Sequence, residues 1–210
     1  MIRIITFIAL FIALFIASVA TAQTKFDQGM ASALKTLKEG KTSEALVQFE
    51  RIASVEKANW LPNYYIALSN TIQAFDEKDK VKTIELLQNA QKAQDICNRL
   101  AGDNPEVLVM QAMIHTAWIV YDPMIYGRTL SEDVMSLLNR AYEIAPENPR
   151  VVFQKASFEM GMANYFGQDT QPMCGQIEKS IKLFATFKPE TPSHPNWGLE
   201  KAQEASKNCK

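Results

Sequence analysis

The chain has 210 residues, 47% of them hydrophobic, and its 22 Lys and Arg against 23 Asp and Glu give a formal net charge of −1. This length and composition suit ordinary globular structure. The small net charge, mixed along the chain, argues against nucleic acid or an anionic membrane surface as an electrostatic partner.

The first segment, MIRIITFIALFIALFIASVATA, differs in composition from the remainder of the chain. Arg3 precedes an apolar run over residues 4–20, and Ala20-Thr21-Ala22 follows. This order is typical of a secretory signal peptide. An uncleaved anchor is the alternative, because the run approaches the ~17–25 residues that span a bilayer. We expect a signal peptide over residues 1–22, cleavage after Ala22, and a periplasmic or secreted domain over residues 23–210 that is free of the membrane.

Apolar residues recur at helical spacing through the rest of the chain, without a convincing alternating strand pattern. We expect Thr42 or Ser43 to cap the second helix, after a break at Gly40. The other expected helices cover residues 26–39, 64–75, 79–100, 106–121, 131–144, 150–166, 174–187 and 197–207. Residues 122–129 are expected to form a loop, and residues 188–195 to be extended.

Four of the expected helix starts share a local pattern. The pattern is set by Pro62, Pro105, Pro149 and Pro195, which recur at intervals of 43, 44 and 46 residues. The seventh residue after each proline is small: Ser69, Ala112, Ala156 and Ala202. Proline suits the first turn of a helix because its missing N–H needs no partner there, and a small residue two turns later lets a paired helix approach. Because one helical hairpin cannot bury both of its faces, the repetition predicts hairpins that stack and share a core.

Residues near these turns match a known repeat pattern. They are Gly40, Ala45 and Phe49 within one repeat, and Ala141, Pro146 and Ala156 at the junction of two repeats. On these residues the chain resembles the tetratricopeptide repeat family over roughly residues 26–187. The resemblance implies an all-α fold, a right-handed α-solenoid of about four antiparallel helical hairpins with a C-terminal capping helix. The intervals exceed the family's usual repeat of about 34 residues, and another α-solenoid or an irregular helical bundle is the alternative fold.

The resemblance also implies a function, that of a scaffold binding a protein or peptide on the concave face formed by the first helix of each pair. The family's groove positions correspond here to Asn63, Asn70, Gln73, Met113, Thr116, Arg150, Phe153, Met160 and Asn164. This neutral and partly apolar set suits an extended peptide or an amphipathic helix of unknown identity. In the alternative, several of these side chains pack inside the fold.

Two other functions remain open. One is a ligand carrier or small enzyme with a pocket near residues 115–128, lined by His115, Tyr126 and Arg128. Tyr121, Tyr126 and Arg128 flank the expected loop and could form a contact surface, since Tyr and Arg dominate binding hot spots. They could equally fill a gap in an irregular hairpin. The other function is a structural homo-oligomer that stacks end to end.

The sequence favours neither catalysis nor a bound metal or cofactor. The two histidines, His115 and His194, lie in no metalloprotease motif, and neither a nucleophile elbow nor a phosphate-binding loop occurs. His115 lies between apolar neighbours and is expected to pack in the core. We therefore expect a protein that is not an enzyme.

Three cysteines, Cys97, Cys174 and Cys209, allow at most one internal disulfide. Export would permit such a bond. We favour Cys174 with Cys209, because a C-terminal helix often folds back on the last hairpin. Three separate thiols are the alternative.

Overall fold

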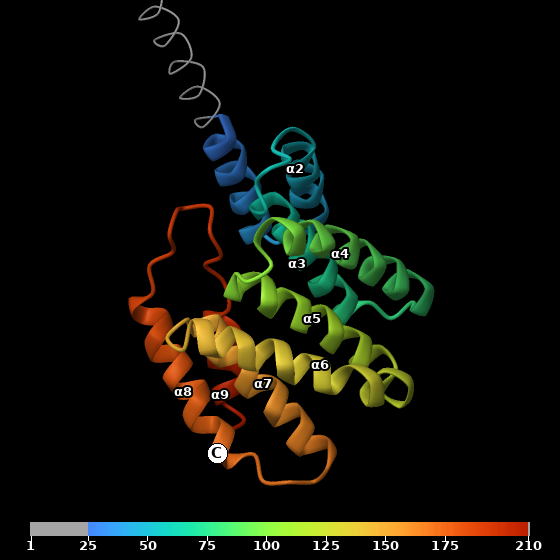
Figure 1. The fold of residues 1–210 in the computed structure, drawn as a ribbon, viewed down its shortest axis with the longest axis vertical. Helices are drawn as coiled ribbons and strands as arrows, with labels where there is room; N and C mark the ends of the chain where they lie inside the picture. The colour runs from blue at the N-terminus through green and yellow to red at the C-terminus, as the bar shows by residue number, and fades with distance from the viewer. Residues whose placement is uncertain (1–24, 210) are drawn as a thin grey trace, which may run out of the picture. The chain divides into compact units, whose positions relative to one another are not determined.

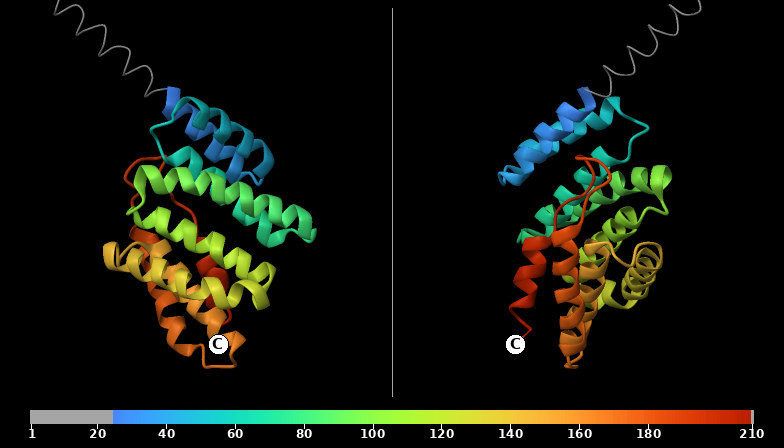
Figure 2. Two further views of the ribbon diagram at one scale, coloured as in Figure 1. Left: turned by 45° about the vertical axis from the view of Figure 1, so that its right-hand side comes forward. Right: turned by 90° about the vertical axis from the view of Figure 1, so that its left-hand side faces the viewer.

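The computed structural model describes residues 25–209, and within that range every regular element is a helix and no strand occurs (Figures 1 and 2). The predicted all-α class is therefore confirmed. The expected signal peptide, residues 1–22, lies outside the described residues. Among the helices of residues 25–209, none combines the length and apolar character needed to cross a membrane.

The chain divides into two compact units between Lys57 and Ala58, and each is described by itself. The first unit contains a helical hairpin made by residues 25–38 and by α2 (Thr42–Val55). Gly40 lies in its turn with φ +78°, a left-handed conformation that glycine adopts without a steric penalty. The glycine that the sequence placed just past a helix end therefore allows the chain to reverse.

The start of α2 differs from the prediction. The residue that caps the helix is Lys41, whose side chain makes no capping hydrogen bond, so the expected cap by Thr42 or Ser43 is wrong. Both of those residues lie inside the first helical turn. Glu44 in the same turn stabilises the helix start, because negative charge is favourable near the N-terminal end of the helix dipole.

The second unit contains seven helices within the described residues. They are α3 (Leu61–Asp76), α4 (Lys80–Ala101), α5 (Pro105–Tyr121), α6 (Pro123–Ile144), α7 (Pro149–Tyr165), α8 (Gln171–Thr186) and α9 (Leu199–Ser206). The side chains of Asn104, Asp122 and Asn148 cap α5, α6 and α7 by accepting hydrogen bonds from N–H groups of the first turn. A proline follows each of these caps, where its missing N–H leaves no bond unmade.

Helices of the second unit pack as successive pairs. The closest pairs are α3 with α4, α5 with α6, and α7 with α8, each antiparallel (Figure 1). The first members also contact one another, α3 with α5 and α5 with α7. Ser69, Ala112 and Ala156, the small residues of the repeat, are each no more than 1% exposed. Their small size allows the close approach of helices that the spacing predicted.

One predicted loop is helical. Residues 122–129 were expected to connect two helices, but α6 begins at Pro123. Asp122 accepts hydrogen bonds from the backbone N–H groups of Met124 and Ile125, and so starts the helix directly after α5 ends. The turn between α5 and α6 is therefore a single residue, and α6 is longer than predicted by two turns.

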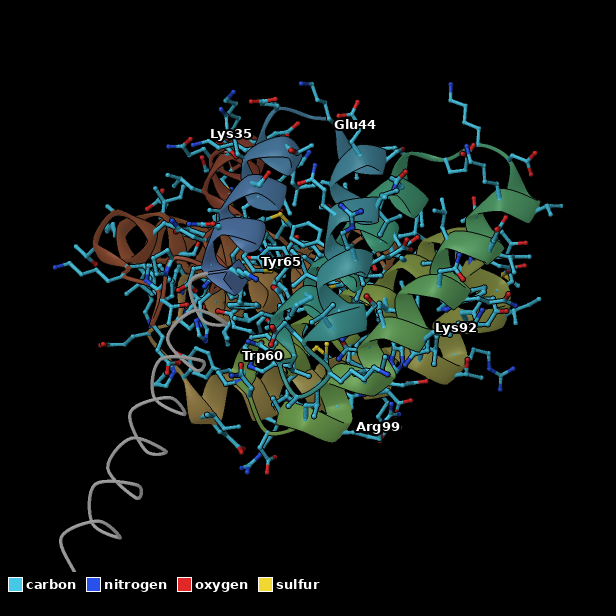
Figure 3. All side chains as sticks on the ribbon, turned by 90° about the horizontal axis from the view of Figure 1, so that it is seen from above. Lys35, Glu44, Trp60, Tyr65, Lys92 and Arg99 are labelled. Carbon is cyan, nitrogen blue, oxygen red and sulfur yellow. A yellow bond between two sulfur atoms is a disulfide. The ribbon has the colours of Figure 1, made fainter. Side chains whose placement is uncertain are left out.

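The two faces of α4 differ in polarity. Lys92 and Arg99 are exposed along the helix (Figure 3), whereas Leu87 and Cys97 are fully buried. Val81, in contrast, has a side chain that is 77% exposed. With about 3.6 residues per helical turn, Val81 lies on the opposite side of α4 from Thr83, which is buried on the same face as Leu87 and Cys97.

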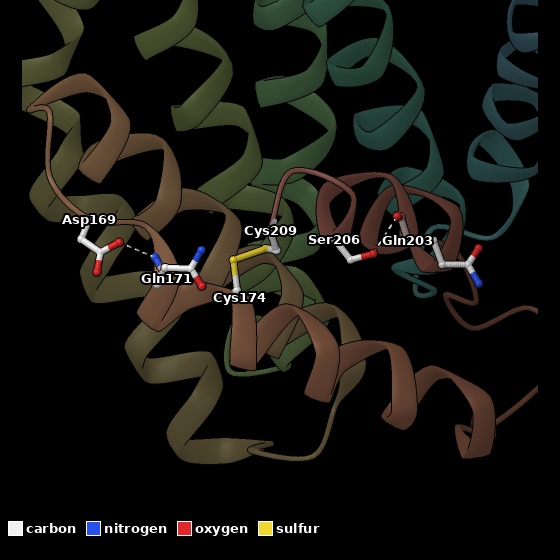
Figure 4. The surroundings of a disulfide bond; sticks show 6 residues. All are labelled: Asp169, Gln171, Cys174, Gln203, Ser206 and Cys209. Carbon is white, nitrogen blue, oxygen red and sulfur yellow. Dashed lines mark hydrogen bonds between the residues drawn. A yellow bond between two sulfur atoms is a disulfide. The ribbon is translucent and has the colours of Figure 1, made fainter.

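The C-terminal segment returns to α8. Residues 187–198 contain no helix, and α9 then packs against α8. A disulfide joins Cys174, in the first turn of α8, to Cys209, which follows α9 (Figure 4). This is the pairing that the sequence favoured. Gly198 precedes α9 with φ +111°, and a Cβ there would lie 2.9 Å from the Phe184 ring, so the position requires glycine.

The third cysteine provides a test of the packing. Cys97 is free and buried, and burial raises the pKa of its thiol to about 12. Because the thiolate is the reactive form, we expect native protein at pH 8 to resist iodoacetamide for hours and denatured, unreduced protein to gain one adduct within minutes. Intact-protein mass spectrometry measures both. Rapid single modification of the native protein would contradict this packing.

Candidate functional site

A cavity of about 610 Å³ lies between α5, α6 and α7 in the second unit. Each helix presents residues at i, i+3 and i+4 spacing, which places them on one face. From α5 these are Ala112, Met113, Thr116, Ile119 and Val120. From α6 they include Met124, Gly127, Arg128 and Ser131, and from α7 Ser157, Phe158, Gly161, Met162 and Tyr165. The volume lies within the ~300–1,000 Å³ usual for small-molecule sites.

Small residues explain why the cavity exists. Gly127 in α6 and Gly161 in α7 both line it, and a Cβ added at either would meet nothing within 4 Å. Glycine in a helix interior lowers helix stability by about 0.5–1 kcal/mol relative to alanine. Because neither glycine has a side chain, the space beside each of them stays unfilled.

Most of the cavity wall is apolar and part of it is open to solvent. Three methionines contribute, Met113, Met124 and Met162, and methionine adapts its shape to a bound surface. At the rim, Tyr165 and Phe166 are 66% and 61% exposed, with their rings edge to face at 5.2 Å. Exposed apolar side chains that continue into a cavity mark a binding site for an apolar ligand.

Arg128 is the one charged residue among the lining side chains within residues 25–209. Its guanidinium has no hydrogen-bond or ion-pair partner in the described part of the chain. The other polar groups at the wall are the neutral side chains of Thr116, Ser131, Gln154 and Ser157 and the hydroxyl of Tyr165. The site therefore combines an apolar surface with one unpaired positive charge.

The sequence-predicted site residues divide into several groups. Met113, Thr116 and Arg128 line the cavity. Tyr121 and Tyr126 instead pack on Trp118, with ring centroids 5.8 and 5.0 Å from it. These tyrosines join the start of α6 to the end of α5, so they fill the corner between the two helices.

Three further predicted residues lie away from the cavity wall. Gln73 is half-buried and donates a hydrogen bond to the backbone oxygen of Ser69 in its own helix. Met160 is half-buried, and Asn164 is exposed on α7. A protein partner could reach Asn164, but these three side chains do not form one surface with the cavity.

Other predicted groove residues are buried, which corrects the expectation. Asn63, Asn70 and Phe153 are each no more than 5% exposed. Asn70 donates to the backbone oxygen of Ile66, which satisfies one of its hydrogens within α3. Phe153 lies on α7, which packs against α5, α6 and α8. The burial of these three side chains agrees with the alternative in which several of the groove positions pack inside the fold.

Arg150 is the clearest correction, because it is fully buried. Its Nε and Nη2 atoms donate to the two carboxylate oxygens of Glu106 at 2.8 and 2.6 Å. Asn148 donates to the same carboxylate at 2.6 Å, and the guanidinium lies 4.6 Å from the Phe187 ring centroid. Burial opposes the charge on Arg150, but the hydrogen bonds and attraction from Glu106 outweigh it and raise the pKa of the guanidinium.

Two tyrosines of α3, Tyr64 and Tyr65, lie beside the buried Arg150–Glu106 ion pair, and these residues together are called the buried polar centre. Burial raises the pKa of Tyr64 well above its ordinary value, and the Glu106 carboxylate raises it further. Burial likewise raises the pKa of Tyr65. The Tyr64 hydroxyl accepts from the Trp197 indole at 3.0 Å, and the Tyr65 hydroxyl donates to the Ser193 carbonyl at 3.2 Å. These bonds attach the segment before α9 to α3. The buried polar centre therefore stabilises the fold.

The structure offers no argument for catalysis around His115. The ring is half-buried, and its Nδ1 atom is buried without a hydrogen-bond partner in residues 25–209. Burial lowers the pKa of His115, with Asp133 opposing the shift. His115 is not among the lining residues of the cavity, which differs from the predicted pocket. Among the described residues, no three His, Cys, Asp or Glu side chains gather as metal ligands would.

Sequence reasoning missed most of the apolar wall. Val120 and Met124 lie within the predicted pocket region, residues 115–128, but were not named as lining residues. Phe158, Met162, Tyr165 and Phe166 lie outside that region. A signal for them exists, because α7 carries apolar residues on more than one face and because Gly127 and Gly161 occur within segments of helical pattern. This pattern indicates more apolar surface than the core requires, but it does not indicate which residues line a common cavity.

Comparisons with known proteins give one likeness in structure. No protein-family model matches the chain, and no curated protein matches it in sequence. Among solved structures, the fold is similar to that of the HusA haemophore from Porphyromonas gingivalis, with a TM-score of 0.77 and 24% sequence identity. The similarity covers 88% of this chain and 92% of that one. At this level of identity, the likeness shows that the two chains share a fold.

Proposed function

We propose that the protein is a carrier that binds haem, or a closely related porphyrin, in the cavity between α5, α6 and α7. The observation that carries the proposal is the cavity itself, an apolar space of about 610 Å³ with an open rim. The similar fold of a protein named a haemophore supports the choice of ligand. This proposal develops the ligand-carrier alternative of the sequence analysis.

The wall chemistry suits such a ligand. A porphyrin is flat and mostly apolar, and its natural forms carry carboxylates at the ring edge. The three helix faces supply apolar side chains for the ring, while Arg128 supplies a positive charge. The lining also includes methionine and tyrosine, which are residue types that ligate haem iron in proteins.

The proposal extends to architecture. The successive pairs α3–α4, α5–α6 and α7–α8, with contacts between their first members, support a right-handed solenoid of the tetratricopeptide-like kind. In that arrangement the cavity lies between one pair and the first helix of the next. We retain a protein-binding role as the second candidate, favoured by the exposed rim of Tyr165 and Phe166.

We also propose that the carrier acts outside the cytoplasm and is not an enzyme. The disulfide between Cys174 and Cys209 supports export, because such bonds persist in oxidising compartments. The Arg3, apolar and Ala-Thr-Ala order of residues 1–22 supports the same route. The carrier role requires no group that reacts with its ligand.

A cavity-filling variant tests the function. Gly161→Phe places a ring in the empty space beside Gly161, and removing glycine from a helix interior favours folding. We expect haem to titrate the wild-type chain to saturation at one per chain, and Gly161→Phe to weaken binding at least tenfold. Soret absorbance measures both.

Gly175→Phe is the matched control, because Gly175 lies in α8, is exposed, and also has no atom within 4 Å of an added Cβ. It should bind as the wild type does. Absence of saturable binding by the wild type would refute the carrier function. Unchanged binding by Gly161→Phe would place any ligand elsewhere.

A further inference from the structure

We propose that Arg128 binds a carboxylate of the ligand and so makes the site specific for an anionic, amphipathic molecule. The inference rests on the proposed function and concerns one residue of the same cavity. Arg128 is exposed at the cavity, and within residues 25–209 it has neither an ion-pair nor a hydrogen-bond partner. Arginine recognises carboxylates through two parallel hydrogen bonds, so a free guanidinium beside an apolar wall suits such a group.

The surroundings favour a ligand over a neighbouring side chain as its partner. Glu132 lies one turn further along α6, at the i+4 spacing that allows an ion pair, yet it makes none with Arg128. The Asp122 carboxylate at the start of α6 already accepts two backbone N–H groups. Arg128 instead shares the face of α6 that carries Met124 and Ser131 to the cavity.

Gly127 adds a geometric reason. It lines the cavity beside Arg128, and the space where its Cβ would lie is open. The edge of a flat ligand can therefore approach the α6 backbone next to the guanidinium. Arg128 is the one cationic side chain in the described cavity wall, so the site can pair with one carboxylate of the ligand. A second carboxylate would remain exposed to solvent.

The test pairs a protein change with a ligand change. Haem and its dimethyl ester share ring and iron, but the ester lacks the negative charges. We expect Arg128→Gln to weaken haem binding about tenfold, as the loss of an exposed charge-assisted hydrogen bond would. The ester should bind the wild type and Arg128→Gln with equal affinity. The loss for haem should shrink at high salt, because an exposed pair is screened.

Arg140→Gln is the control, since Arg140 lies on the same helix, is exposed and does not line the cavity. It should bind haem as the wild type does. Equal binding of haem by the wild type and Arg128→Gln would overturn the inference while leaving the carrier function standing. A similar loss for haem and ester would also overturn it, because packing rather than charge would then be responsible. Failure of the wild type to bind either ligand would instead refute the proposed function.

Discussion

Replacing Arg150 with methionine is expected to lower the free energy of unfolding of the second unit by about 3–5 kcal/mol, a loss typical of a broken buried ion pair. Arg150 is fully buried and makes two hydrogen bonds to the Glu106 carboxylate. Methionine fills much of the same volume but leaves the carboxylate inside the protein without its cation. Chemical denaturation followed by circular dichroism measures the change.

Two further variants separate the ion pair from packing. Glu106→Gln combined with Arg150→Met removes both charges, and we expect it to recover a large part of the loss, because an uncompensated buried charge is the main penalty. Arg140→Met removes an exposed pair with Glu143 and should change stability by less than about 1 kcal/mol. Equal losses for the single and double variants would contradict this account.

Local helix signals could be predicted from the sequence because they depend on neighbouring residues. The helices α5 and α7 each start within one residue of the predicted place, at Asn104-Pro105 and Asn148-Pro149, with the asparagine as cap and the proline in the first turn. The small residues Ala112 and Ala156 are buried between helices as the repeat predicts. Cap chemistry and close approach act within two turns of chain, so one sequence is enough to find them.

The expected loop over residues 122–129 shows where local signals mislead. The segment contains proline at position 123 and glycine at position 127, two residue types that often interrupt helices. Proline is favourable in a first turn, however, and Asp122 caps it. Gly127 lies in the helix interior beside open space. Packing of α6 along α5 outweighs the low helix propensity of glycine.

The binding site was harder to predict because contacts between distant residues decide it. Arg150 carries a charge and occupies a groove position in the repeat pattern, which favoured exposure. Its partner Glu106 lies 44 residues away on another helix, so the sequence does not reveal the pair. The cavity wall likewise needs three helix faces brought together. A pocket near residues 115–128 could be proposed, whereas the contribution of α7 could not.

Removing the disulfide is the second change expected to have a large effect. Cys174→Ser with Cys209→Ser should lower the free energy of unfolding of the second unit by about 4 kcal/mol. The sequence separation is 35 residues, and a closed loop of that length restricts the unfolded chain by about this amount in the chain-entropy model. The same denaturation experiment measures it, with the wild type in oxidising buffer as reference.

Reductant provides the internal control for this variant. Dithiothreitol should bring the wild type down to the stability of the double variant, and should leave the double variant unchanged, because Cys97 is unpaired. Haem binding should persist in the folded variant, since neither Cys174 nor Cys209 lines the cavity. A variant as stable as the oxidised wild type would show that α9 is held mainly by its other attachments, the bonds from Trp197 to Tyr64 and from Tyr65 to Ser193. The size of the loss therefore measures how far the covalent link, rather than the buried polar centre, holds the C-terminal segment.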